Sequence, residues 1–253
     1  MTKIAVTGYK GFIGSELVKN GCIPITSDIT DYPKLREELS TISPDILIHA
    51  AAKTDVDWCE ANEKEAFRVN VRGTSNVDFA CRYAGVKLLY LSTFHVFSGH
   101  SIKPYKEKSI CRPKNVYGFT KWTGELVSIA DNKQAKIVRL GSVYSDETVK
   151  PILDKLVGGE VISFPTFIKR SYTMLWWVVD GLLLMANSFD KVTSIINLVP
   201  RNQCMSNYEF WSKQSFEAFG TPRDEEIEGM TFRPHNGCLD GTLFYNIFGD
   251  LSL

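Results

Sequence analysis

The stretch KIAVTGYKGFIG, from Lys3 to Gly14, places three glycines between an apolar run and the start of a helical pattern. Gly8, Gly11 and Gly14 follow the expected first strand at the spacing G-x-x-G-x-x-G. Glycine permits a tight turn and a close approach of pyrophosphate to the backbone, and a helix N-terminus offers unpaired N–H groups to the anion. The stretch therefore predicts a dinucleotide-binding loop, with a purely structural turn as the alternative.

Strand-like and helical stretches alternate on both sides of this loop through the first two-thirds of the chain. The run DILIHAA, residues 45–51, is apolar without alternation, which indicates a strand buried on both faces. This rhythm predicts right-handed βαβ units on a doubly wound parallel sheet, a Rossmann fold of the α/β class. The expected strands lie at residues 3–8, 22–26, 45–51, 86–92 and 135–143, and the expected helices at 12–20, 33–41, 62–84 and around Tyr117.

The rhythm loosens after about residue 145. Helices are expected near 149–157, 175–187 and 207–219, and a strand at 194–199, with an irregular piece at 163–172. We expect a dinucleotide-binding core at residues 1–145. Residues 146–253 are expected to form a small substrate-binding lobe with elements that return to the core, so that the two parts do not fold independently.

Composition excludes several classes of partner. Among 253 residues, 29 Lys and Arg balance 29 Asp and Glu, so no net charge attracts nucleic acid or an anionic membrane. The run MLWWVVDGLLLMA is interrupted by Asp180 and Gly181 and is too short to span a bilayer. We expect no signal peptide, because no basic segment and apolar run stand before the first strand, and we expect no catalytic metal, because no cluster has metal-ligand spacing. The six cysteines lack a C-x-x-C pair, which predicts reduced thiols in a cytoplasmic protein.

The choice of dinucleotide depends on two charged residues. Asp28 follows the second strand, where a carboxylate that binds the ribose favours NAD(H). Lys10 lies inside the glycine loop and can pair with the 2′-phosphate of NADP(H). Alternatively, Lys10 is solvated and Asp28 caps the next turn. We favour NADP(H) and leave NAD(H) open.

A tyrosine and a lysine share a helix face in NVYGFTKWTG. Tyr117 and Lys121 are four residues apart, and residues at that spacing point the same way. A nearby ammonium and an oxidised nicotinamide ring both lower the pKa of a phenol, so that it can protonate a carbonyl that receives hydride. The alternative is an amphipathic helix with one buried aromatic.

A hydroxyl before this helix supports the catalytic interpretation. LLYLSTFHVF ends an expected strand with Ser92 and Thr93, at the sheet edge where open α/β sheets bind ligands. Thr93 can donate to the same carbonyl oxygen, although threonine also ends strands through β propensity alone. The glycine loop, the strand-end hydroxyl and the Tyr–Lys helix follow one another in the order that one active site requires.

Several stretches resemble the extended short-chain dehydrogenase/reductase family, and within it the dTDP-4-dehydrorhamnose reductase group. They are TGYKGFIG, SPDILIHAAAKTDVDWCE, RVNVRGTSNV, LSTFHVFSG, PKNVYGFTKWTGE, IVRLGSVY and FRPHNGCLDGTLF. The resemblance implies reduction by NAD(P)H of the 4-keto group of a nucleotide-diphosphate 4-keto-6-deoxyhexose. A homodimer is a separate expectation, and the oligomeric state stays open. It implies catalytic roles for Thr93, Tyr117 and Lys121, and backbone support by Asn70. The cofactor residues that it implies, besides Tyr117 and Lys121, are Gly8, Tyr9, Lys10, Gly11, Phe12, Ile13, Gly14, Asp28, Ile29, Ala51, Ala52 and Thr54.

The chain departs from that group where the sugar is held. The group reads S-T-D-Y-V-F where this chain reads Ser92 to Phe97 as STFHVF, and Ser142 replaces an expected tryptophan. A G-x-N-F stretch is replaced by SDETV. We therefore expect Thr93, His95 and Ser142 to contact the substrate, while the identity of the sugar stays open.

This chain also resembles bifunctional 3,5-epimerase/4-reductases. At the position of His95, those enzymes carry a cysteine that transfers protons. A histidine can abstract a proton next to a 4-keto group, or it can bind a sugar hydroxyl. Two other functions stay open. One is a regulatory subunit that resembles the β subunit of methionine adenosyltransferase, and the other is a nucleotide-sugar epimerase or dehydratase. A dehydratase carries an acidic pair after the threonine, which Phe94 and His95 do not supply.

Overall fold

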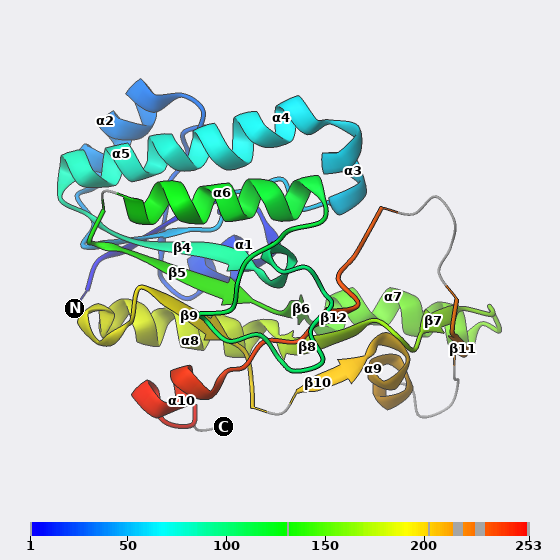
Figure 1. Cartoon of the computed structure of the whole chain (residues 1–253). Coiled ribbons are helices and arrows are strands. Elements are labelled where there is room, and N and C mark those ends of the chain that lie inside the picture. The colour runs from blue at the N-terminus through cyan, green and yellow to red at the C-terminus, as the bar shows by residue number, and fades with distance from the viewer. Residues whose placement is uncertain (1, 131, 202, 215–219, 226–230, 252–253) are drawn as a thin grey trace.

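A parallel six-stranded sheet forms the centre of the computed structural model, which describes residues 2–130, 132–201, 203–214, 220–225 and 231–251. The strand order is β2-β1-β3-β4-β5-β9 (Figure 1). The strands are β1 Ile4–Thr7, β2 Ile23–Pro24, β3 Ile46–His49, β4 Lys87–Thr93, β5 Ala135–Leu140 and β9 Ile195–Leu198. The order reverses between β1 and β3, so the prediction of a doubly wound parallel sheet is confirmed.

Helices cover both faces of this sheet (Figure 1). One face packs against α1 Phe12–Lys19 and α8 Leu175–Asn187. The other face packs against α2 Tyr32–Ile42 and α5 Thr74–Ala84, and α6 Val116–Ala130 lies beside α5. These helices bury both surfaces of the sheet, which is why strands β1 and β3 are buried throughout.

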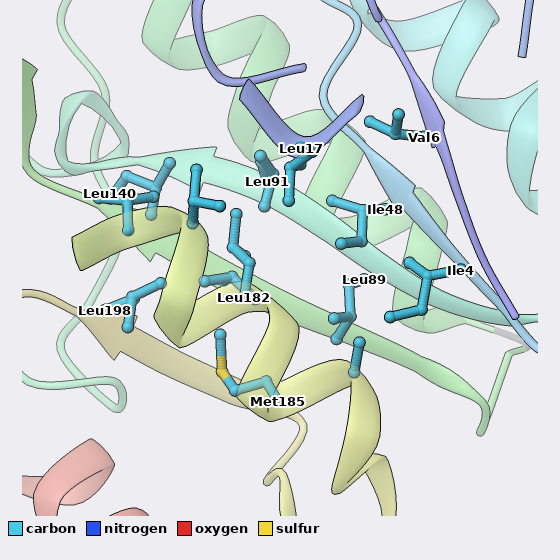
Figure 2. Packing of buried hydrophobic residues seen from close by; sticks show 14 of the residues in the cluster. Ile4, Val6, Leu17, Ile48, Leu89, Leu91, Leu140, Leu182, Met185 and Leu198 are labelled. Atoms are coloured by element: carbon cyan, nitrogen blue, oxygen red, sulfur yellow. The ribbon is translucent and has the colours of Figure 1, made fainter. Parts of the chain in front are cut away.

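The core between the sheet and α8 is built from aliphatic side chains. Figure 2 shows Leu182 and Met185 of α8 between Leu89 of β4 on one side and Leu198 of β9 on the other. The apolar run of α8 is thus explained by burial in the protein core, and its interrupting residue Asp180 is exposed. No helix in the described part of the chain has both the length and the apolar character needed to cross a bilayer. The cytoplasmic location stays a prediction.

The helix expected at residues 62–84 is interrupted by a π-helical turn. It consists of α4 Glu63–Phe67, the π-helical segment Arg68–Gly73 and α5, and it is preceded by a short helix that the sequence did not predict, α3 Val56–Ala61. Asn70 lies in the π-helical turn and is buried. Its side chain accepts from Lys53 N–H (2.8 Å) and donates to Lys53 O (2.9 Å), which ties the turn to the loop after β3. These are the backbone contacts expected of Asn70.

The second part of the chain adds a smaller sheet beside the carboxyl ends of the central strands (Figure 1). It contains β6 Ser142–Tyr144, β8 Lys169–Met174, β10 Cys204–Ser206 and β12 Asn236–Gly237, with β7 Ser163–Pro165 paired to β11 Thr221–Arg223. The helices here are α7 Asp146–Val157, α9 Asn207–Gln214 and α10 Thr242–Phe248. Strand β9 and helix α8 return to the central sheet, whereas the division after residue 145 stays a prediction.

Two expectations about strands need correction, and one helix was missed. The piece at 163–172 is not irregular, because β7 and the start of β8 lie there and pair with residues far along the chain. The strand expected at 135–143 is two strands, because a Cβ on Gly141 would lie 2.1 Å from Ser171 O, so the chain bends there against β8. Helix α10 was not predicted. Residues 215–219 of the expected helix 207–219 lie outside the described residues.

The prediction of six reduced cysteines is wrong for one pair. Cys204 and Cys238 form a disulfide across 34 residues of sequence. They meet because β10 and the segment that includes β12 both pair with β8, a non-local arrangement that cysteine spacing cannot reveal. The free cysteines are Cys22, Cys59, Cys81 and Cys111.

Candidate active site

The glycine loop forms a cradle in which Gly8 and Gly14 are packed so closely against backbone atoms that neither position has room for a side chain. Gly8 has a φ of +72°, and a Cβ there would lie 2.7 Å from Ala51 N. A Cβ on Gly14 would lie 2.2 Å from Gly8 O. In the described structure no side chain caps the start of α1, where Gly11 is the N-cap residue. The first N–H groups of this helix therefore suit a phosphate, and the residues present fit a dinucleotide.

A groove of about 410 Å³ opens beside this loop. Eight predicted cofactor residues line it: Gly8, Tyr9, Lys10, Gly11, Asp28, Ile29, Ala51 and Ala52. Of the six other predicted cofactor residues, Phe12, Ile13 and Gly14 lie in α1 and Thr54 lies in the exposed loop after β3. Tyr117 and Lys121 lie in α6. The sequence analysis missed Ile25, Thr26, Ser27, Ala50, Lys53 and Val69, which also line the groove.

Asp28 is held in place by Thr30. The N–H and the hydroxyl of Thr30 both donate to the Asp28 carboxylate at 2.8 Å, and the backbone bond is the main reason that the pKa of Asp28 is lowered. The turn-capping alternative is thus present in the structure. Arg68 and Lys53 also lower the pKa of Asp28, so this carboxylate lies among cations that the sequence did not single out.

Thr93, Tyr117 and Lys121 are buried at the carboxyl end of β4 and the start of α6. Burial raises the pKa of the Tyr117 phenol to about 12, and the Thr93 side chain acts in the opposite direction. The influence of Thr93 on this pKa indicates that the strand-end hydroxyl lies near the phenol, whereas the catalytic roles of both residues stay predictions. The expected lowering of the phenol pKa is not found in the protein alone, because burial outweighs the influence of Thr93.

Lys121 is also shifted by burial. Its pKa falls to about 7, and the Glu125 carboxylate one turn further along α6 opposes that change. The Lys121 Nζ lies 4.0 Å from the centre of the Tyr90 ring. A cation–aromatic contact of this kind favours the charged form of an ammonium that has little water around it. Near neutral pH, Lys121 is therefore divided between its charged and neutral forms.

A buried ion pair supports the helix that carries these residues. Arg139 of β5 binds Glu125 through Nη2 at 2.7 Å, and both side chains are almost fully buried. Ser92 donates to the same carboxylate at 2.5 Å. The network ties α6 to β4 and β5, one helical turn from Lys121.

His95 borders the same site. Its ring lies edge-on to the Tyr117 ring, with 5.4 Å between the ring centres. The Asn115 side-chain amide faces its Nδ1 at 3.0 Å. Burial lowers the pKa of His95 to about 3, and the nearby cations Arg170 and Arg233 act in the same direction.

Arg170 and Arg233 are candidate site residues that sequence reasoning missed. Burial lowers the pKa of Arg170, and its Nε has no hydrogen-bond partner among the described residues. Arg233 binds Asp57 at 2.7 Å. The only signals were an arginine in a piece expected to be irregular and another in the stretch FRPHNGCLDGTLF. The structure brings both near His95 and places Ser142, half-buried, at the start of β6.

The described residues contain no group of three or more His, Cys, Asp or Glu side chains arranged to hold a metal ion. The absence of a catalytic metal stays a prediction.

Comparison with known proteins identifies the family of this chain. The model for "RmlD substrate binding domain" matches residues 2–161. A dTDP-4-dehydrorhamnose reductase of Mycobacterium tuberculosis strain H37Rv is 34% identical over 58% of this chain and 52% of its own length. The chain spans about half the length of the first curated relatives it matches.

Two further proteins match more of the chain. The methionine adenosyltransferase 2 subunit beta of Xenopus laevis is 32% identical over 84% of this chain and 68% of its own. The crystal structure of a dTDP-4-dehydrorhamnose reductase from Bacillus anthracis strain Ames in complex with NADP superposes with a TM-score of 0.86 at 26% identity, covering 100% of this chain and 93% of that one. With its glycine cradle and its buried Thr–Tyr–Lys constellation, this chain belongs to the family defined by the RmlD substrate-binding domain.

Proposed function

We propose that this protein reduces the 4-keto group of a nucleotide-diphosphate 4-keto-6-deoxyhexose of the dTDP- or UDP-4-keto-rhamnose type, using NADPH. The observation that carries the proposal is that Thr93, Tyr117 and Lys121 are all buried at the carboxyl end of a Rossmann sheet, with Thr93 ending β4 and the other two one turn apart on α6. The names of the reductases from Mycobacterium tuberculosis and Bacillus anthracis support the same activity.

Each residue of the constellation has a defined task. A pKa of about 12 keeps the Tyr117 phenol protonated at neutral pH, so that it can donate its proton to the ketone oxygen. Thr93 donates to the same oxygen and orients the carbonyl. Lys121, with a pKa near 7, can supply the positive charge that stabilises the phenolate left behind. The bound nicotinamide supplies the hydride for sugar C4.

The groove residues are proposed to hold the cofactor. The N–H groups at the start of α1 would bind the pyrophosphate, and Gly8 and Gly14 would let it approach the backbone. Lys10 and Lys53 line the groove and Arg68 lies beside Asp28, so positive charge is available for a 2′-phosphate. NADP(H) is favoured for this reason, and NAD(H) is the alternative in which Asp28 binds the ribose.

The substrate diphosphate is proposed to lie near Arg170 and Arg233. Arg170 has a buried Nε without a partner among the described residues, and an anion is the ligand that such a donor fits. Thr93, His95 and Ser142 are proposed to contact the sugar.

The bifunctional alternative, in which His95 also epimerises C3 and C5, has less support. A general base works best when its pKa lies near the working pH, and the pKa of His95 is about 3. Its Nδ1 also faces an N–H group of Asn115. We therefore propose a reductase without epimerase activity. Deuterium from solvent should not enter C3 or C5 during turnover, whereas incorporation that stops in His95→Ala would establish the bifunctional enzyme.

The reductase proposal is tested by following NADPH oxidation with a panel of dTDP-, UDP- and GDP-4-keto-6-deoxyhexoses. At least one sugar should support oxidation, and Tyr117→Phe should lower that rate by about 10²- to 10⁴-fold. The exposed variant Tyr83→Phe serves as the matched control. Oxidation with none of the sugars would overturn the proposal.

A second function is favoured by the similarity to methionine adenosyltransferase 2 subunit beta, which extends over 84% of this chain. The departures at Phe94, His95 and Ser142 fit a site that binds without turnover. In that case sedimentation velocity should detect a complex with a methionine adenosyltransferase catalytic subunit, and no sugar of the panel should oxidise NADPH.

Self-association is a separate proposal. Phe79 and Tyr83 on α5, and Phe119 and Leu126 on α6, are exposed on neighbouring helices. A homodimer would cover such apolar side chains. Sedimentation velocity of the purified chain should give a dimer, and the double variant Phe79→Ser/Leu126→Ser should shift it to a monomer.

A further inference from the structure

His95 lies in a short turn, residues Phe94–Val96, immediately after β4. It follows Thr93 by two residues, and its ring meets the edge of the Tyr117 ring. The side chain is 6% exposed, so water does not compete freely for its ring nitrogens. The protonation of each nitrogen is therefore set by the protein groups around it.

Asn115 has its amide orientation fixed by two backbone groups. The N–H of Gly118 donates to Asn115 Oδ1 at 2.7 Å. Asn115 Nδ2 donates to Phe232 O at 2.9 Å. A backbone N–H can only donate and a backbone carbonyl can only accept, so the reversed amide would lose both bonds.

The same amide nitrogen approaches His95 Nδ1 at 3.0 Å. Because the amide N–H is a donor, Nδ1 must be the acceptor and carries no proton. A neutral imidazole with a bare Nδ1 carries its proton on Nε2. Protonating Nδ1 would set two donors against each other, and the positive charges of Arg170 and Arg233 disfavour a second cation here.

We propose that His95 is a substrate-positioning residue that donates one hydrogen bond, from Nε2–H, to a sugar hydroxyl beside the reacting ketone. The sugar part of this proposal rests on the reductase function proposed above, whereas the fixed tautomer does not. With Nδ1 engaged and Nε2 protonated, neither ring nitrogen is free to remove a proton from carbon. His95 thus selects for an acceptor oxygen at one position of the sugar ring.

The tautomer can be measured without any substrate. The chain has four histidines, so ¹⁵N-histidine labelling gives a tractable spectrum in which His95→Asn identifies the His95 signals. We expect an unprotonated Nδ1 and a protonated Nε2 that stay unchanged between about pH 5 and pH 8, where an ordinary histidine titrates. A proton on Nδ1, or a titration within that range, would overturn the tautomer assignment.

Two matched variants test the role of each His95 ring nitrogen separately during turnover. His95→Asn places an acceptor where Nδ1 lies but lacks the outer donor, whereas His95→Gln places an amide N–H where Nε2–H lies. We expect KM for the sugar to rise about tenfold in His95→Asn with kcat little changed, and His95→Gln to recover most of that loss. Equal losses in both variants, or an unchanged KM in His95→Asn, contradict the positioning role.

The two experiments distinguish a failure of the proposed reductase function from a failure of the inference about His95. If the wild-type protein oxidises NADPH with no sugar, the reductase and the sugar contact both fail, while the spectrum still decides the tautomer. If the wild type turns over and the spectrum shows Nδ1 protonated, the reductase stands and the inference about His95 fails.

Discussion

Gly118 lies against His95 so closely that a Cβ atom at position 118 would sit 2.2 Å from the His95 carbonyl oxygen. This contact packs the first turn of α6 onto the turn after β4, and the two segments carry Tyr117 and Thr93. We expect Gly118→Ala to destabilise the protein by about 1–3 kcal/mol, because an overpacked core strains its neighbours. The proposed reductase activity should fall by more than the loss of folded protein accounts for. Urea unfolding and NADPH oxidation check the two effects.

The control for this variant is Val157→Ala, an exposed position at the end of α7 and outside the proposed dimer surface. It should leave stability within about 0.5 kcal/mol of wild type. An active Gly118→Ala protein with unchanged stability would show that α6 tolerates displacement from the turn.

Much of the core fold follows from local signals. The loop from Gly8 to Gly14 joins an apolar strand to a helix, and the patterns on either side repeat that alternation. Such periodicity indicates which face of a helix or strand is buried, so the sequence alone predicts a sheet with helices on both faces. Helix α8 is also correctly predicted, because its length and apolar character decide between a helix and a strand.

The missed features depend on contacts between distant residues. Strands β7 and β11 each have three residues and pair with each other across more than fifty positions, so neither carries a periodic signal. The π turn at Asn70 depends on the Lys53 backbone, and the partner of Cys204 is set by the pairing around β8.

The candidate site shows the same division. Thr93, Tyr117 and the glycines were predicted because their types and order carry the chemistry. The environment that sets pKa values was not, since burial of Tyr117 and Lys121 is a tertiary property. Arg170 was missed because the strand that buries it was not expected.

The buried pair of Glu125 and Arg139 should be far more costly to break than an exposed pair. Arg139→Met leaves the Glu125 carboxylate buried without its partner, so we expect a loss of about 3–5 kcal/mol in the free energy of unfolding. The exposed pair of Lys150 and Asp154 is the control, and Lys150→Met should cost less than about 1 kcal/mol. Similar losses in the two variants contradict the burial of the first pair.

Lys121 should make stability depend on pH. Its folded-state pKa of about 7 is lower than its ordinary value of 10.5, so between these values the unfolded chain binds more protons than the folded protein. The contribution of Lys121 to stability is therefore fully present above pH 10.5 and is lost as the pH falls through about 7. Compared with wild type, Lys121→Met should be more stable at pH 7, and this advantage should shrink as the pH rises towards 10.5.

Urea unfolding of both proteins at several pH values measures this difference. Subtracting the free energy of unfolding of the variant from that of wild type at each pH cancels the contributions of the other groups that titrate in the same range. An advantage for Lys121→Met that stays constant across the range means that the folded-state pKa of Lys121 is not lowered.

The disulfide between Cys204 and Cys238 should stabilise the second part of the chain. A bond that closes a loop of this length contributes about 2–4 kcal/mol, chiefly by restricting the unfolded chain. The double variant Cys204→Ala/Cys238→Ala should lose that amount, and its unfolding should no longer respond to a dithiol reductant. A thiol titration of the unfolded, unreduced wild type should find the four remaining cysteines, and six would show that the bond is absent.

Lys10 and Lys53 should set the preference for NADPH over NADH. Both line the groove beside Asp28, and a hydrogen bond between an ammonium and a phosphate contributes more than one between neutral groups. We expect Lys10→Gln/Lys53→Gln to weaken NADPH binding about tenfold or more and to leave NADH binding nearly unchanged, because only NADPH carries the 2′-phosphate. The double variant Lys19→Gln/Lys150→Gln is the matched loss of two charges, because both lysines are exposed, lie outside the groove and pair with Glu16 and Asp154. Direct titration of each cofactor, followed by fluorescence, reports binding even if no sugar is turned over. Equal weakening of both cofactors would place these lysines at the shared pyrophosphate, and NADH that binds as tightly as NADPH to the wild type would mean that Asp28 selects the ribose of NAD instead.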